Sequence, residues 1–260
     1  MPHADLHVHT TRSDGQLTLE ALPAAARRAD VAVTAVTDHD RLHPDLDAPV
    51  VEREGVPIVN GIELRVAAPH ERIDLLGYGV DPDAAGDLRA ECRRLQDDRI
   101  ERARAMTEAV EDRLGIDLDL AYEPGVGRPN LARAIDAHPD TDVDYEAAFD
   151  DLIGDGGPCF VARDVPDFER GLSLLRETCG VVSLAHPLRY DDPAAALELA
   201  PRCDAVEGPY PYGSSVDEGL VERTVAEHDL LVTGGSDAHD ERLGLAGLSE
   251  GEFDRLAAHL

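Results

Sequence analysis

Asp5-Leu6-His7-Val8-His9 lies near the start of the chain and alternates polar with apolar side chains, which predicts a β-strand with both histidines on one face. A helix is predicted over residues 18–29, and the apolar run 31–36 predicts a buried parallel strand. Further strands are predicted at 57–60, 73–78, 181–184, 204–207 and 230–233, with helices at 168–178 and 215–227 and a short helix between 40 and 57. The alternation of strands and helices predicts an α/β fold on a parallel sheet or barrel.

The middle of the chain departs from this alternation. From residue 86 to residue 159 the sequence predicts helices and turns without a strand, and residues 87–114 read as one long helical stretch with many charges. We therefore predict an all-helical insertion subdomain at 86–159, packed over one end of a barrel domain that is formed by residues 1–85 and 160–260.

Polar side chains of metal-ligand type follow the predicted strands. They are His7, His9, His39, Asp40, Glu63, Asp74, His186, Asp237 and His239. The C-terminal ends of the strands form the functional face of parallel α/β barrels. His7 with His9, and Asp237 with His239, are each two residues apart, a spacing that places both side chains on one face of a strand. One such pair is a weak signal, but pairs at the first and last strands together predict a centre for divalent metal ions.

The same segments resemble the motifs of the PHP (polymerase and histidinol phosphatase) family. Residues 5–10 with 13–15 look like its motif I, residues 37–40 like motif II, and residues 185–187 and 235–239 like motifs III and IV. Residues 61–63, 75–79 and 127–129 are similar to its stand-alone phosphoesterases, a branch that contains nucleoside 3′,5′-bisphosphate phosphatases and related 5′-to-3′ exoribonucleases.

The resemblance implies a distorted (β/α)7 TIM-like barrel that holds two or three divalent metal ions. Residue by residue, it assigns His7, His9, Glu63 and Asp237 to the first ion. Glu63 would bridge to a second ion that is held also by His186 and Asp74, and Asp14, His39 and His239 would hold the third. Imidazole and carboxylate ligands without a thiolate suit Mn²⁺, Fe²⁺ or Zn²⁺, and the carboxylates at positions 14 and 74 favour Mn²⁺.

The activity that the resemblance implies is phosphoric ester hydrolysis, as a phosphatase or a phosphodiesterase. The substrate would be a phosphate monoester of a small nucleotide or the 5′ end of a short RNA, attacked by a water that the metals activate. Glu63, Asp237 and His239 are expected to be catalytic. The alternatives are metal-dependent hydrolysis of a C–N bond, as in amidohydrolases, and a metal-binding module without turnover.

Residues that contact the substrate are predicted beside these motifs. Arg128 is the strongest candidate because its planar guanidinium can donate two hydrogen bonds to one phosphate. A surface ion pair is the alternative for this side chain. Asn130, Arg163 and Ser13 are the weaker candidates, and Asp40 is expected to orient an imidazole.

The chain departs from the branch at three places. Asp74 precedes Leu75 where a histidine is usual, and Asn130 follows Pro129 where the branch again has a histidine. Residues 208–211, Gly-Pro-Tyr-Pro, replace a more usual acidic and aromatic run.

The composition excludes several classes of function. The 260 residues carry 54 acidic and 24 basic side chains, a net charge of −30, and every basic residue is arginine. The absence of lysine excludes a P-loop and a Schiff-base lysine. The spread of the acids predicts adaptation to a salt-saturated cytoplasm, with an acidic protein of a high-GC genome as the alternative. We expect a cytoplasmic protein with no membrane segment, no DNA-binding motif and no evident protein partner.

Overall fold

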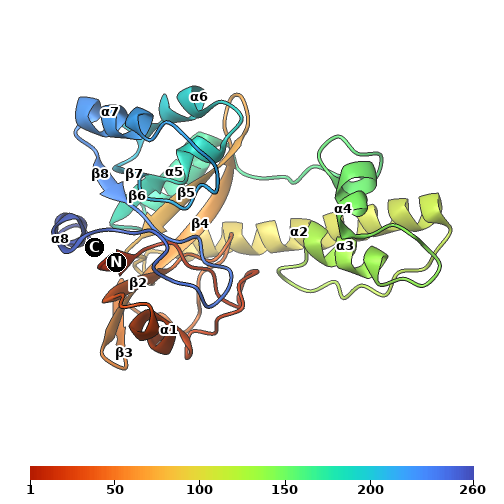
Figure 1. Cartoon of the computed structure of the whole chain (residues 1–260), viewed down its shortest axis with the longest axis horizontal. Coiled ribbons are helices and arrows are strands. Elements are labelled where there is room, and N and C mark those ends of the chain that lie inside the picture. The colour runs from red at the N-terminus through yellow and green to blue at the C-terminus, as the bar shows by residue number, and fades with distance from the viewer. The chain divides into compact units, whose positions relative to one another are not determined.

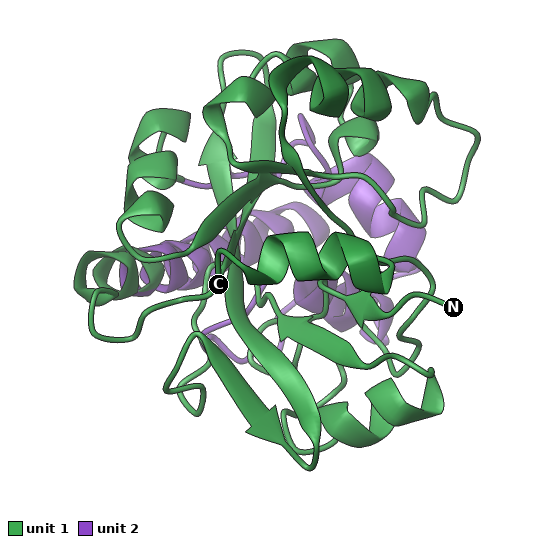
Figure 2. Ribbon diagram, turned by 90° about the vertical axis from the view of Figure 1, so that its left-hand side faces the viewer, with its two compact units in different colours: residues 1–92, 165–260 green, residues 93–164 purple.

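The computed structural model describes residues 1–260, which form two compact units (Figures 1 and 2). Unit 1 contains Met1–Cys92 and Val165–Leu260, and unit 2 contains Arg93–Asp164. Every strand of the structure lies in unit 1, whereas unit 2 is helical.

Unit 1 is an α/β fold with one curled sheet (Figure 1). Its strands are β1 (Ala4–Asp5), β2 (Val33–Val36), β3 (Val50–Arg53), β4 (Val56–Ala67), β5 (Arg72–Tyr78), β6 (Val181–Leu184), β7 (Ala205–Glu207) and β8 (Leu231–Thr233). Their order in the sheet is β1-β2-β4-β5-β6-β7-β8, and β3 pairs with β4. The predicted strands are therefore all present, although β1 is shorter than predicted and β4 is longer.

Two expectations for the sheet are wrong. β5 runs antiparallel to both β4 and β6, so the sheet is mixed rather than parallel. The chain reverses after β4 in a short turn in which Ala68 donates a backbone hydrogen bond to Glu71, and such a hairpin needs no crossover helix. The segment expected to be a short helix instead contains β3, which pairs antiparallel with β4. Glu54 and Gly55 join them with positive φ angles of 49° and 78°, as a tight β-hairpin requires.

The helices of unit 1 cover the sheet. The helical elements of the chain are α1 (Leu22–Arg28), α2 (Gly86–Leu114), α3 (Arg128–Asp136), α4 (Tyr145–Ala148), the π-helix η1 (Phe149–Ile153), α5 (Phe168–Arg176), the 3-10 helix η2 (Pro187–Arg189), α6 (Pro193–Leu197), the 3-10 helix η3 (Ala200–Arg202), α7 (Gly219–His228) and α8 (Glu250–Ala257). α5 packs against β4, β5 and β6, α7 packs against β7, and α8 packs against β8. None of these helices combines the length and the apolar character that crossing a bilayer requires.

Each unit has a core of its own. In β2, Val33 and Ala35 pack into the cluster that contains Tyr78 and Leu256, whereas Val36 packs into the cluster that contains Leu22 of α1. Apolar side chains of one strand thus fill both faces of the sheet, which is why the run 31–36 has no polar alternation. Unit 2 has a separate cluster that draws on α2, α3, α4 and η1.

The chain segments that follow β1 and β8 are joined by backbone hydrogen bonds. Leu6 donates to Gly234 over 3.0 Å, and His9 donates to Ala238 over 2.9 Å. Gly235 passes so close that a Cβ atom there would lie 2.3 Å from the nitrogen of His7, so only glycine fits. The first and last metal-ligand motifs are therefore held side by side by the main chain.

Candidate metal centre

Three groups of buried or half-buried ligand side chains lie at one edge of the sheet in unit 1. The outer cluster contains His9, Asp14, His39 and His239; the central cluster contains His7, His9 and Glu63; the inner cluster contains Glu63, Asp74 and His186. Within each cluster the ligand-type atoms all lie within 4.8 Å of one another. His9 and Glu63 each belong to two clusters, so the three clusters form one continuous centre.

The central cluster is completed by Asp237. Its Oδ1 atom lies 3.1 Å from Nε2 of His9 and 3.5 Å from Nε2 of His7. The other oxygen of Asp237 accepts hydrogen bonds from Tyr210, over 2.6 Å, and from Arg189, over 3.0 Å. These two bonds fix the carboxylate and leave Oδ1 directed at the imidazoles.

The outer cluster gathers three imidazoles around one carboxylate. Asp14 lies 3.3 Å from Nε2 of His239 and 3.8 Å from Nε2 of His39. The rings of His9 and His239 stack with centroids 4.2 Å apart. Half of the Asp14 side chain is exposed, so solvent reaches this cluster.

Unpartnered polar atoms show that these residues suit a metal. Nε2 of His7, both ring nitrogens of His9 and Oε2 of Glu63 are buried and have no hydrogen-bond partner. Buried polar atoms without a partner are rare and costly, and divalent cations bound among these residues would give such atoms a partner. The outer and central clusters therefore fit divalent metal ions.

Closely packed acids and imidazoles set the electrostatics of the centre. Burial opposes a charge on His39, but Glu63 and Asp14 outweigh it and raise the pKa of His39 to about 9. Burial would raise the pKa of Glu63, yet His39 and His7 hold it well below its ordinary value. Burial likewise opposes ionisation of Asp237, and the imidazoles of His9 and His7 beside it lower its pKa. Glu63 and Asp237 are thus kept ionised, ready to bind cations.

Residues around the centre hold its ligands in place. Oε1 of Glu207 lies 2.9 Å from Nδ1 of His7, and Oε2 accepts the backbone N–H of His186 over 2.7 Å. Engaging Nδ1 of His7 leaves Nε2 for a metal, as is usual for ligand histidines. Asp38 accepts hydrogen bonds from the backbone and the hydroxyl of Thr10, and Asp5 accepts from Ser236, so buried carboxylates brace the loops that carry the ligands.

Strained backbone also positions the ligands. Asp237 and His186 have φ angles of 49° and 26°, a region that residues other than glycine seldom adopt. Such strain costs about 1–3 kcal/mol per residue and persists where the surroundings fix the turn. His186 lies two residues after the end of β6 and Asp237 four residues after the end of β8, so each belongs to the loop that follows its strand.

Other predicted site residues have different contacts. Asp40, which was expected to orient an imidazole, accepts the backbone N–H of Arg65 over 3.0 Å. Ser13 donates its hydroxyl to Asp38 over 2.6 Å, and Oδ1 of Asn130 accepts the backbone N–H of Gly127. Arg128, Asn130 and Arg163 belong to unit 2, whereas every residue of the three clusters belongs to unit 1.

Arg128 is paired within unit 2. Its Nη1 atom donates to Asp155 over 2.7 Å, and its guanidinium lies over the rings of Phe149 and Phe160. This is the ion pair that the sequence left as the alternative, although the guanidinium remains more than a quarter exposed. Its contact with a substrate stays a prediction.

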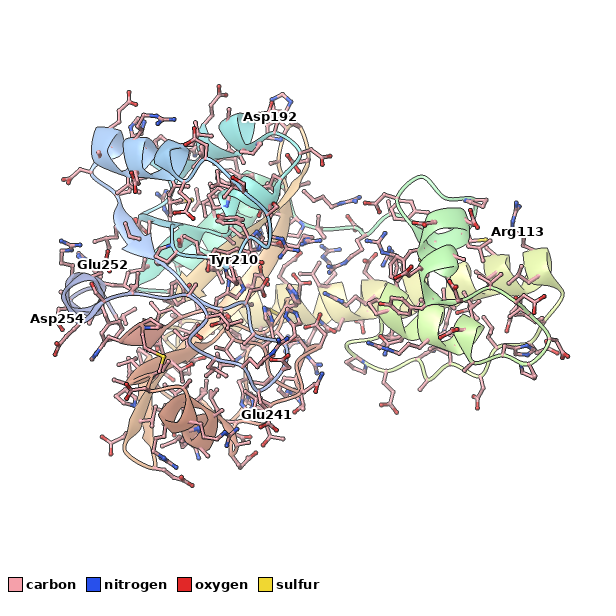
Figure 3. The ribbon with its side chains drawn as sticks, viewed as in Figure 1. Arg113, Asp192, Tyr210, Glu241, Glu252 and Asp254 are labelled. Atoms are coloured by element: carbon pink, nitrogen blue, oxygen red, sulfur yellow. The ribbon has the colours of Figure 1, made fainter.

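Four further residues lie at the site and were not predicted from the sequence: Arg65, Arg189, Glu207 and Tyr210. Glu207 ends a predicted strand, so the rule that found the other ligands would have found it. Arg65 lies two residues after Glu63 on β4, and extending the predicted strand 57–60 would have placed both on one face. Together with Arg189 and Tyr210, Arg65 lines a cavity of about 370 Å³ beside the clusters. Figure 3 labels Tyr210 toward the middle of unit 1 and the acids Asp192, Glu241 and Asp254 at its periphery.

Two curated relatives align with most of this chain. A 3′,5′-nucleoside bisphosphate phosphatase of Chromobacterium violaceum is 32% identical over 200 residues, which are 74% of this chain and 69% of the relative. A phosphoribosyl 1,2-cyclic phosphate 1,2-diphosphodiesterase of Eggerthella lenta is 30% identical over 251 residues, 90% of this chain and 93% of the relative. The chain belongs to their phosphoesterase family. No family model matches the chain.

The fold is shared with a solved structure. A Bifidobacterium adolescentis protein assigned as a candidate metal-dependent phosphoesterase superposes with a TM-score of 0.80 over 99% of this chain and 96% of that protein, at 22% identity. The protein is thus a phosphoric ester hydrolase with an α/β fold. Clusters of side chains that could hold metal ions lie at one edge of its sheet.

Proposed function

We propose that the protein is a metal-dependent phosphatase of the PHP type, on a distorted (β/α)7 barrel, that acts on small nucleotides. The observation that carries the proposal is the convergence of the three clusters on one polar cavity of about 370 Å³. Relatives named as a nucleoside bisphosphate phosphatase and as 5′-3′ exoribonucleases support 3′,5′-bisphosphorylated nucleosides or short RNA 5′ ends as substrates.

The chemistry follows from the ligands and their neighbours. Divalent ions would polarise the phosphoryl oxygens and activate the attacking water. Asp237 and Glu63 present carboxylate oxygens to the imidazoles of His7 and His9, and these residues would hold the ions. Arg189 lines the cavity and is about half exposed, so it can donate to a phosphoryl oxygen that becomes more negative during attack.

Manganese is the proposed metal. Imidazole and carboxylate groups make up all three clusters, and no cysteine joins them. A centre of two to three ions follows from the number of clusters. The four cysteines are free and lie outside the three clusters.

Unit 2 is proposed to be the helical insertion predicted at 86–159 and to supply contacts to the substrate. Arg128 supports this role because its guanidinium lies against two aromatic rings, which leaves it rigid and partly exposed. Arg163 and Asn130 are proposed as its neighbours in that role, as expected from the sequence.

Phosphate release from a defined panel tests the proposal. Metal-free protein, reloaded with Mn²⁺, is assayed on 3′,5′-bisphosphorylated nucleosides, mononucleotides and short 5′-phosphorylated RNA, with a cyclic amide as the C–N substrate. His9→Gln and Asp237→Asn are expected to lose at least about 1,000-fold in turnover, because each removes a ligand from the centre. His228→Gln and Asp229→Asn, on the exposed end of α7, are the matched controls. Unchanged turnover in both site variants, or activity on the amide alone, would overturn the proposal.

A further inference from the structure

Arg65 and Asp74 form a bidentate ion pair inside the inner cluster. They face each other directly across the antiparallel pair of β4 and β5. Nε of Arg65 donates to Oδ1 of Asp74 over 2.7 Å, and Nη2 donates to Oδ2. Asp40 holds the backbone of Arg65, and the hydroxyl of Tyr190 accepts the backbone N–H of Asp74 over 2.7 Å, so both strands are fixed at this point.

The ion pair leaves the inner cluster with fewer free ligand atoms for a metal ion. Both oxygens of Asp74 already accept hydrogen bonds from a cation, whereas His7, His9 and Glu63 keep buried atoms without a hydrogen-bond partner. Asp74 is 1% exposed, so separating it from Arg65 would leave a desolvated carboxylate. A divalent ion at this cluster would also lie beside a positive guanidinium. The inner cluster therefore fits a metal ion less well than the other two.

We propose that the Arg65 guanidinium replaces a divalent ion at the inner cluster, so that the centre binds metal at the outer and central clusters only. The inference rests on the proposed metal-dependent function. Arg65 supplies the positive charge that a third ion would otherwise bring to the inner cluster, and it is a determinant of specificity for a phosphate monoester.

The charge of the site supports this assignment. Four carboxylates belong to the centre: Asp14, Glu63, Asp74 and Asp237. Two divalent ions, with Arg65 and Arg189, would exceed them by about two positive charges, which matches the dianion of a phosphate monoester at neutral pH. A third ion would raise the excess to about four, more than such a substrate can balance.

Geometry also allows Arg65 to reach the substrate. Its side chain is 37% exposed and lines the cavity that Asp237 and His239 line. Pairing with Asp74 uses one Nε–H and one Nη2–H, which leaves N–H donors of the guanidinium for a phosphoryl oxygen. An arginine held in this way is preorganised, so its donors need little reordering when the substrate binds.

Counting Mn²⁺ ions by native mass spectrometry and by elemental analysis, without substrate, tests the proposal. The wild-type protein is stripped with a chelator and titrated with Mn²⁺, and we expect about two ions per chain. Arg65→Gln frees the Asp74 carboxylate and should bind about three. Asp74→Asn should keep the wild-type count, because Asp74 holds no ion in this proposal. Arg27→Gln removes the same charge from an exposed pair with Glu54 and should change nothing.

The outcomes separate this inference from the proposed function. Three ions in the wild-type protein, or a count in Arg65→Gln equal to that of the wild type, would overturn it. Thermal unfolding of each variant shows that the protein is folded, and Arg65→Lys, which keeps the charge, should bind as many ions as the wild type. If the counts agree with expectation while no substrate on the phosphate panel is hydrolysed, the proposed function fails and the assignment of Arg65 stands.

Discussion

The outer and inner clusters use the same ligand chemistry, but different groups balance their charge. In the outer cluster one half-exposed carboxylate, Asp14, lies among three imidazoles. In the inner cluster two carboxylates are 1% exposed and share one imidazole, and Arg65 is paired with one of them. Buried carboxylates need a cation at all times, whereas a solvated one does not. The buried carboxylate of Asp74 therefore has a fixed cation beside it, whereas the outer cluster, with its half-exposed carboxylate, is left for exchangeable metal.

Substitution of Glu63 is expected to have the largest effect, because Glu63 belongs to the central and inner clusters at once. Glu63→Gln keeps the shape of the side chain and removes its charge. We expect more than about 100-fold loss of Mn²⁺ affinity and of phosphate release, beyond what substitution of a residue behind a ligand produces. Titration with Mn²⁺ measures the affinity, and Glu52→Gln on exposed β3 is the control. An unchanged affinity would show that Glu63 holds no metal ion.

Substitution of Glu207 tests a residue that holds a predicted ligand in place and is not itself expected to bind metal. Glu207→Gln weakens the hold on Nδ1 of His7 while leaving the outer cluster untouched. We expect a loss of about 10- to 100-fold in Mn²⁺ affinity at the central cluster alone. Glu227→Gln on α7 is the matched control, and equal losses at both metal sites would contradict the separation of the clusters.

His39 gives the smallest effect, which appears in the metal-free protein. Its pKa is raised to about 9 in the folded state, so its contribution to stability is complete below about pH 6.5 and is lost as the pH rises through 9. The melting temperature without metal should fall by about 5 °C between these values, and His39→Asn should flatten the fall. With Mn²⁺ present the trend reverses, since ligation requires neutral imidazoles. A metal-free melting temperature that does not fall in the wild type would contradict the prediction.

Short spacings in the sequence predicted most of the side chains that the structure gathers in the three clusters. His7 with His9, and Asp237 with His239, are two residues apart after strands, and the structure brings both pairs to one edge. The strands 181–184, 204–207 and 230–233 were predictable because their apolar runs are bounded by turn residues and polar strand ends. The resemblance to the PHP family placed Glu63 and His186 beside them, in agreement with the clusters.

Patterns of neighbouring residues do not predict how distant strands pair with one another. The sequence shows that residues 57–60 and 73–78 form strands, but an apolar strand run fits a parallel or an antiparallel neighbour equally well. The turn at 68–71 makes the pair antiparallel, and the register then sets Arg65 opposite Asp74. Residue types and short spacings thus specify which groups can bind metal, because they act within a few residues of chain. The identity of the cation beside each carboxylate depends on strand direction, register and burial, which arise only when segments far apart in the chain pack together.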